Sequence, residues 1–183
     1  MHTSTDDPVQ EALKRREQRQ EQNIGILIRQ LSDGNPNLRV RSAETLGTIG
    51  DPRAVEPLIG CLEDPVPDVV WIALRALGTI GDPRAFDPIV PCLARPDRWT
   101  RQGAAQALGD LRDPRAAEYI VPLLQDPKKG VRSAAAEALG KLADSRYVPV
   151  LESALRDDEH EVREAARMAI RNLAEKPAGP SGQ

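Results

Sequence analysis

The decapeptide Ala-Leu-Gly-Thr-Ile-Gly-Asp-Pro-Arg-Ala at residues 76–85 decides the fold of this chain, because it recurs. Residues 45–54 read Thr-Leu-Gly-Thr-Ile-Gly-Asp-Pro-Arg-Ala, and residues 107–116 read Ala-Leu-Gly-Asp-Leu-Arg-Asp-Pro-Arg-Ala. Shorter copies follow near residues 138–146 and 169–170. The second position, which we call the anchor, repeats every 31 residues without insertion, at Leu46, Leu77, Leu108, Leu139 and Ile170. A fixed period of this size predicts an all-α solenoid of stacked units.

Each unit carries signals for two helices, A and B. In the third unit, Asp82 and Pro83 are suited to the N-cap and first turn of helix A, after Gly81 has ended the preceding helix. Helix B is expected from about residue 98 to residue 111. Prolines inside the A helices should kink or shorten them; they are Pro57, Pro88, Pro91, Pro122 and Pro149.

Glycines recur inside the B helices, directly after the anchor. They are Gly47, Gly78, Gly109 and Gly140. Because glycine costs about 1 kcal/mol relative to alanine in a helix interior, its recurrence there indicates a close approach between helices.

Composition restricts the functional classes. Aromatic residues make up only 3% of the 183 residues, which predicts an aliphatic core, and the net charge of -3 argues against a dedicated nucleic-acid-binding protein. The N-terminus has no apolar segment typical of a signal peptide, and no apolar run is long enough for a membrane span. Cys61 and Cys92 occupy the same slot in adjacent repeats, too far apart for a disulfide. We therefore expect free thiols and a cytoplasmic location.

The repeat resembles the HEAT repeat, specifically the phycobilisome-lyase-like (E-Z) subclass. The resemblance rests on Val-Arg-Ser-Ala-Ala-Ala-Glu-Ala-Leu-Gly at residues 131–140 and on the Asp-Pro-Arg-Ala turns. It implies a right-handed α-solenoid in which the B helices line a concave, partner-binding side. It covers five repeats within residues 22–174, bounded at 22–50, 51–81, 82–112, 113–143 and 144–174.

The segments outside the repeats are polar. Residues 1–21 are expected to form a capping helix after a frayed start, with Asp7 as N-cap; the alternative is a charged arm that binds a partner. Residues 175–183 are low in apolar side chains and rich in Pro and Gly, so we expect a disordered tail.

An aspartate between the helices and an arginine six residues later form a structural ladder in HEAT-like repeats. Three repeats fit this pattern, with the pairs Asp33/Arg39, Asp126/Arg132 and Asp157/Arg163. We expect each carboxylate to accept hydrogen bonds from helix N-terminal amides and to pair with an arginine from layer to layer. The second and third repeats depart from the pattern, because Asp64 is followed by Val70 and Arg101 is preceded by Arg95.

The two tryptophans mark the candidate binding surface. Trp71 lies six residues before its anchor, a slot that should face outward, and Trp99 lies nine before its own, so both should share one face of adjacent B helices. Trp and Arg are favoured at binding hot spots. The patch would include Arg75, Arg98, Gln102 and Gln106, with Glu44, Glu137 and Lys141 nearby. The alternative is that both rings fill gaps between layers.

Catalytic and metal-binding signals are weak. The histidines are His2, near the N-terminus, and His160, in an acidic cluster that suits helix capping. Deoxyhypusine hydroxylase, a HEAT-like enzyme, holds iron with His-Glu pairs in the slots six and five before the anchor. Those slots here hold Val40-Arg41, Trp71-Ile72, Gln102-Gly103, Ser133-Ala134 and Glu164-Ala165. We therefore expect neither a metal nor another cofactor.

Three functions remain open. The first is a non-enzymatic scaffold, monomeric or within a hetero-complex, that binds a protein on the concave face. The second, implied by the resemblance, is a bilin-lyase subunit that handles a tetrapyrrole on a phycobiliprotein. The third is nucleic-acid binding, with the tryptophans stacking on bases. Its phosphate contacts would come from Arg98, Arg101, Lys128, Lys129, Arg132 and Lys141.

Overall fold

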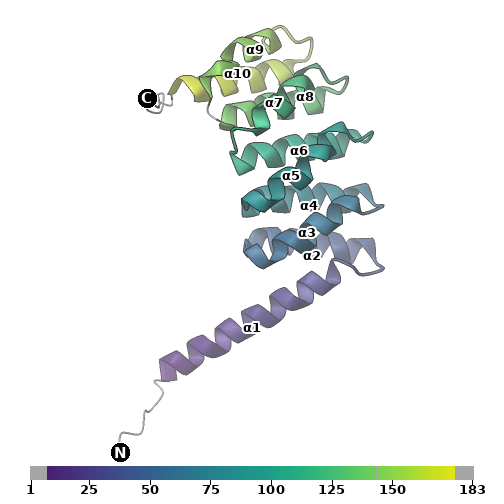
Figure 1. The fold of residues 1–183 in the computed structure, drawn as a ribbon, viewed down its shortest axis with the longest axis vertical. Helices are drawn as coiled ribbons and strands as arrows, with labels where there is room; N and C mark the ends of the chain where they lie inside the picture. Colours follow the sequence, from purple (N-terminus) through teal and green to yellow (C-terminus); the bar gives the residue numbers. More distant parts are fainter. Residues whose placement is uncertain (1–7, 143, 176–183) are drawn as a thin grey trace, which may run out of the picture.

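The computed structural model describes residues 8–142 and 144–175 of the chain. All regular secondary structure in these residues is helical, and the helices stack in chain order into a solenoid (Figure 1). The B helices of the five repeats are α2 (Pro36–Ile49), α4 (Pro67–Ile80), α6 (Arg98–Leu111), α8 (Lys129–Leu142) and α10 (His160–Glu175). The all-α repeat architecture predicted from the 31-residue period is confirmed.

The B helices pack directly on one another through a row of glycines and alanines. A Cβ atom built on Gly109 would lie 2.8 Å from the Cα of Ala138, and one built on Gly47 would lie 2.8 Å from the Cβ of Ala76. Gly78 and Gly140 make the equivalent approach to the next repeat. The recurring glycine therefore serves close helix packing, as predicted, since no larger residue fits between these backbones.

The A helices of the second to fifth repeats are short, because each contains at least one of the predicted prolines. They begin with 3₁₀ turns at η1 (Pro52–Ala54), η3 (Pro83–Ala85) and η6 (Ser145–Tyr147), and Asp51, Asp82 and Asp144 cap these turns. Their segments are α3 (Val55–Gly60), η2 (Cys61–Glu63), α5 (Phe86–Ile89), η4 (Val90–Ala94), α7 (Ala116–Ile120), η5 (Val121–Gln125) and α9 (Val148–Ala154).

The N-terminal helix α1 (Pro8–Gln30) differs from the predicted cap. It is a single 23-residue helix, so no break at residue 21 separates a cap from the first repeat. Residues 9–23 are exposed and slant away from the stack, and Ile24 is the first side chain of α1 to be buried (Figure 1). These residues therefore do not shield the first layer from water, because the chain simply extends the first A helix beyond the solenoid.

The remaining predictions about the ends fall largely outside the described residues. The frayed start at residues 1–6 lies outside them, and so does the predicted tail except for Glu175, which ends α10. Within the described residues no helix is both long enough and apolar enough to cross a membrane.

The core is one aliphatic layer between the A and B helices. The anchors Leu46, Leu77, Leu108 and Leu139 are at most 1% exposed. Cys61 and Cys92 are buried and free, in agreement with the sequence-based expectation. Burial raises the pKa of the Cys61 thiol to about 11, so this thiol stays protonated and unreactive at neutral pH.

Candidate functional site: a groove along the B helices

An arginine–aspartate ladder joins successive repeats and fixes the B helices relative to one another. Arg101 donates from Nε and Nη2 to the carboxylate of Asp126 in the next repeat, at 2.7 and 3.0 Å. Its Nη1 donates to the carbonyl oxygens of Arg95 and Pro96 at 2.9 and 2.8 Å. Every member of the ladder is therefore held by both side-chain and main-chain partners; the pairs are Arg39–Asp64, Arg101–Asp126 and Arg132–Asp157.

The ladder aspartates act as predicted at the helix N-termini but pair in a different register. Asp126, for example, accepts from the Lys128 backbone N–H at 2.8 Å, yet its ion-pair partner is Arg101 of the previous repeat and not Arg132. Arg132 instead contacts the main-chain oxygen of Asp126. The arginine six residues after the aspartate therefore donates to the aspartate's main-chain oxygen. The carboxylate itself pairs with an arginine of the preceding repeat.

Asp64 and Arg101, which depart from the sequence pattern, are both members of the ladder. The missing step lies between Val70 and Arg95, the positions where an arginine and an aspartate would stand. Val70 is only 4% exposed and joins the core, and Arg95 pairs with Glu63 instead. The ladder is consequently interrupted once, between the second and third repeats.

The pKa values of the ladder carboxyl groups follow from this geometry. The hydrogen bond from Arg39 lowers the pKa of Asp64, and the hydrogen bond from Arg132 lowers the pKa of Asp157. Burial raises the pKa of Asp126, but the hydrogen bonds from Arg101 and the Lys128 backbone lower it by more. All three carboxylates are charged at neutral pH.

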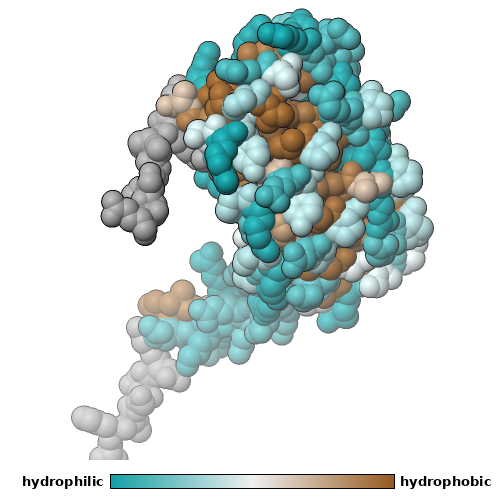
Figure 2. All heavy atoms as spheres, turned by 45° about the horizontal axis from the view of Figure 1, so that its top comes forward, coloured by the Kyte–Doolittle hydropathy of each residue, from teal (hydrophilic) through white to brown (hydrophobic). Residues whose placement is uncertain are grey.

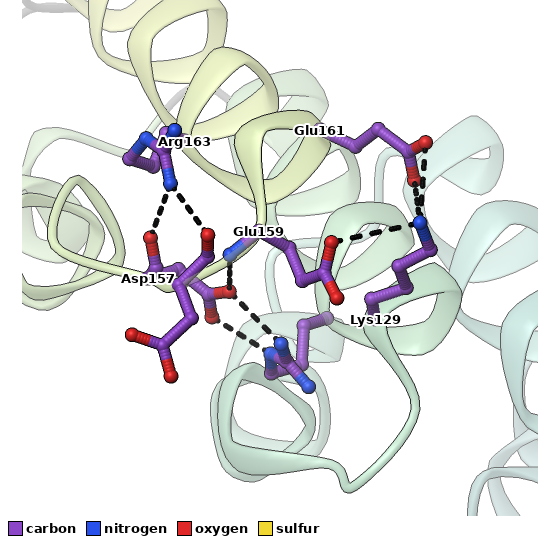
Figure 3. Close-up of polar contacts among 7 residues, drawn as sticks. Lys129, Asp157, Glu159, Glu161 and Arg163 are labelled. Atoms are coloured by element: carbon purple, nitrogen blue, oxygen red, sulfur yellow. Dashed lines mark hydrogen bonds and ion pairs between the residues drawn. The ribbon is translucent and has the colours of Figure 1, made fainter.

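The C-terminal end of the ladder is shown in Figure 3. Asp157 and Glu159 stand at the start of the last B helix, and Lys129 reaches across from the previous repeat toward Glu159 and Glu161, at 3.6 and 3.4 Å (Figure 3). Arg163 donates to the main-chain oxygens of Asp157 and Asp158 at 2.7 and 2.8 Å. Lys129 is therefore neutralised by acidic neighbours, although it lies beside the groove described below.

Trp71 is a packing residue more than a surface residue, contrary to the expectation that its slot faces outward. Its ring is half-buried against α6, where a Cβ atom on Gly103 would lie only 3.1 Å from its Cδ1. The Arg75 guanidinium covers it at 4.8 Å, and its buried Nε1 has no hydrogen-bond partner in the structure. The Trp71 ring can pack between the two layers because Gly103 has no side chain.

Trp99 is the exposed tryptophan, with 48% of its surface accessible. The Arg98 guanidinium stacks on its ring at 4.4 Å. Both line a pocket of about 430 Å³ between α6, α8 and the start of α10, together with Gln102 and Lys128. Trp71 does not line this pocket, so the two tryptophans do not share it.

A second pocket of about 660 Å³ continues from the first along α6, α8 and α10. The two share Gln102, Gly130 and Glu161, and the second adds Gln106 and Met168, the latter 50% exposed. We call the two pockets together the B-helix groove. Arg75 lies apart from it, in a pocket of about 390 Å³ between α2 and α4.

The groove contains some of the residues predicted to bind a partner, together with residues that the sequence did not indicate. Arg98, Trp99, Gln102 and Gln106 line it, whereas Trp71 and Arg75 do not. His160, Glu161 and Glu164 also line it, although the sequence suggested only a solvated helix start. The exposed Met168, two residues before the last anchor, was the signal that could have marked this end of the groove.

The groove combines polar and charged side chains with the exposed Trp99 ring. Within residues 8–142 and 144–175, no cluster of three or more His, Cys, Asp or Glu side chains has the arrangement of a metal site. His160 lies 3.7 Å from Glu164 on an exposed turn. The groove thus presents one exposed aromatic ring, side-chain amides and separated charges.

Comparison with known proteins identifies the family. The family model for HEAT repeats matches residues 24–102 and 86–171. The chain belongs to the HEAT-repeat family. No curated protein matches it in sequence.

Among solved structures, this HEAT-repeat chain is similar to the complex of CpcE and CpcF of phycocyanin lyase from Nostoc sp. PCC7120. The identity is 28% and the TM-score 0.75, over 84% of this chain and 66% of that one, so the chain spans just under two thirds of its neighbour's length.

Two further neighbours show the fold alone. A designed armadillo repeat protein in complex with the peptide (KR)4 is 18% identical, with a TM-score of 0.64 over 93% of this chain and 95% of that one. Human deoxyhypusine hydroxylase in complex with glycerol is 21% identical, with a TM-score of 0.51 over 85% of this chain and 75% of that one. The HEAT repeats are thus established by the family model.

Proposed function

We propose that this protein is a HEAT-repeat scaffold that binds a segment of a partner protein in the B-helix groove. The observation that carries the proposal is Trp99, a 48% exposed ring that stands at a pocket and is stacked by Arg98. Exposed Trp and Arg side chains beside a pocket are the residue types that dominate binding energies at protein interfaces. The Gln102 and Gln106 amides lie along the same groove and can meet the main chain of a bound segment.

The direct test is selection of peptides from a displayed random library on the wild-type protein, followed by titration with each selected peptide. We expect Trp99→Ala to weaken binding by tenfold or more, since truncating a hot-spot side chain costs about 2 kcal/mol or more. Arg75→Ala is the matched control, because Arg75 lies outside the groove and should leave affinity unchanged. Full affinity in a folded Trp99→Ala variant would refute the site.

A second function is favoured by the similarity to the CpcE–CpcF complex of phycocyanin lyase. In that case the protein is a lyase-like subunit, and Trp99 stacks on a tetrapyrrole whose carboxylates meet Arg98 and Lys128. Addition of a free bilin should then shift its absorption band with wild-type protein and not with Trp99→Ala. An unchanged spectrum counts against this function and leaves the scaffold function standing.

A further inference from the structure

The two ends of the B-helix groove carry opposite charges that the protein itself leaves uncompensated. At the Trp99 end, Arg98 and Lys128 form no ion pair among the described residues, whereas Glu159 and Glu161, which line the same pocket, both pair with Lys129. Their neighbour Arg132, by contrast, is neutralised by Asp157. The Arg98 guanidinium rests on an aromatic ring, which holds it in place without cancelling its charge.

At the far end the uncompensated charge is negative. Glu137 is exposed and accepts from the Ser133 hydroxyl at 3.5 Å, but it forms no ion pair among the described residues, since Lys141 on the same helix pairs with Asp110. Glu164, which lines the same end, pairs with Arg167. Glu137 is therefore the carboxylate that a bound segment can neutralise most favourably.

The distance between these charges follows from α8, because Lys128 directly precedes this helix and Glu137 lies within it. Nine residues at about 1.5 Å each place their backbones about 13–14 Å apart. An extended chain covers this distance in about four residues, at about 3.3–3.6 Å per residue.

We propose that the groove selects an extended segment with an acidic side chain at one position and a basic side chain four positions away. The acidic group lies at Arg98 and Lys128, the basic group lies at Glu137, and an apolar side chain beside the acidic one contacts Trp99. This inference rests on the proposed scaffold function and adds the charge pattern and direction of the bound segment. The opposed charges fix that direction, since a reversed segment would place like charges together.

The test uses a protein with Trp71→Phe, in which Trp99 is the single fluorescent tryptophan. The probe is the capped peptide Gly-Leu-Glu-Leu-Gly-Ala-Lys-Gly, whose Glu and Lys are four positions apart. Three matched peptides carry Gln in place of the Glu, of the Lys, or of both. Titrations at low ionic strength follow the Trp99 emission, with Glu152→Gln as a control variant on the exposed side of α9.

We expect the Glu/Lys peptide to bind about two- to thirtyfold more tightly than the doubly neutral peptide, because each of the two exposed ion pairs contributes about 0.2–1 kcal/mol. Lys128→Gln should weaken only the preference for Glu, because Arg98 remains; Glu137→Gln should remove only the preference for Lys, and Glu152→Gln should change neither. Equal binding of all four peptides would overturn the charge pattern and leave the groove function intact. If no peptide changes the Trp99 emission, both the charge pattern and the proposed groove fail.

Discussion

Three arginines act as the connectors between repeats, and each is used in the same way. Arg39, Arg101 and Arg132 place Nη1 on a carbonyl of their own repeat and present Nε and Nη2 to an aspartate 25 residues later. The planar guanidinium suits this role because it donates in two directions at fixed angles. Each arginine therefore links a loop of one layer to a loop of the next.

Arg101→Ala should destabilise the protein by about 1–3 kcal/mol, because it leaves the Asp126 carboxylate without its ion-pair partner and two carbonyl groups without the Arg101 donor. Both side chains of this pair are largely shielded, at 13% and 8% exposed. Arg146→Ala is the control, since Arg146 is 78% exposed and its pair with Asp144 should contribute less than about 1 kcal/mol. Urea unfolding followed by circular dichroism measures both, and equal losses would contradict a special role for the ladder.

The ladder also predicts how stability depends on pH. The pKa values of Asp64, Asp126 and Asp157 are lowered in the folded state, so their contribution is complete above the unfolded value of about 3.9. It is lost as the pH falls below that value through the folded pKa. The free energy of unfolding should therefore change little from pH 7 to 5 and fall from pH 4 toward 2. A free energy of unfolding that stays constant down to pH 2 would exclude this linkage.

At the scale of elements, the two helices of a repeat have different roles. The B helices are uninterrupted and pack backbone against backbone through the glycine–alanine contacts. The A helices of the second to fifth repeats contain prolines and consist of short α and 3₁₀ segments. The stack of B helices is consequently the rigid element, which is why a groove along α6, α8 and α10 can hold side chains at fixed separations.

Gly109→Ala should destabilise the protein by about 1–3 kcal/mol, although alanine is the better helix former. Its added methyl group would lie 2.8 Å from the Cα and Cβ of Ala138, so the two B helices must move apart. Gly60→Ala is the matched control, because a Cβ atom there meets nothing within 4 Å and should stabilise the helix by up to about 1 kcal/mol. Thermal unfolding of both variants distinguishes the cost of the close helix contact from the gain in helix propensity. A higher midpoint for Gly109→Ala than for the wild type would disprove the close approach.

At the scale of the whole molecule, the solenoid begins with the part of α1 that packs against α2, and the preceding residues of α1 protrude. The protruding part of α1 is largely hydrophilic, with a hydrophobic spot near its N-terminal end (Figure 2). Val9 and Leu13 are 61% and 45% exposed, whereas Ile24 is 1% exposed. The protruding residues thus contribute helix without contributing to the core.

Removal of residues 1–17 should leave the midpoint of thermal unfolding nearly unchanged while lowering the helical signal at 222 nm. Ile24→Ala should destabilise the protein by about 2–5 kcal/mol, since it opens a cavity at the start of the core. Differential scanning calorimetry and circular dichroism measure the two effects. A large fall in the midpoint after the truncation would mean that the protruding helix stabilises the solenoid after all.

The sequence by itself determined the repeat, its 31-residue period, the capped turns and the glycine contacts, because these depend on local spacing that recurs in register. Only the tertiary structure decided which groups meet across layers. It paired Arg101 with Asp126 of the next repeat, laid Trp71 against Gly103, and left Trp99 exposed at a groove. The physical reason is that periodicity assigns a residue to a helix face, whereas its burial depends on the size of the side chain opposite it in the neighbouring repeat.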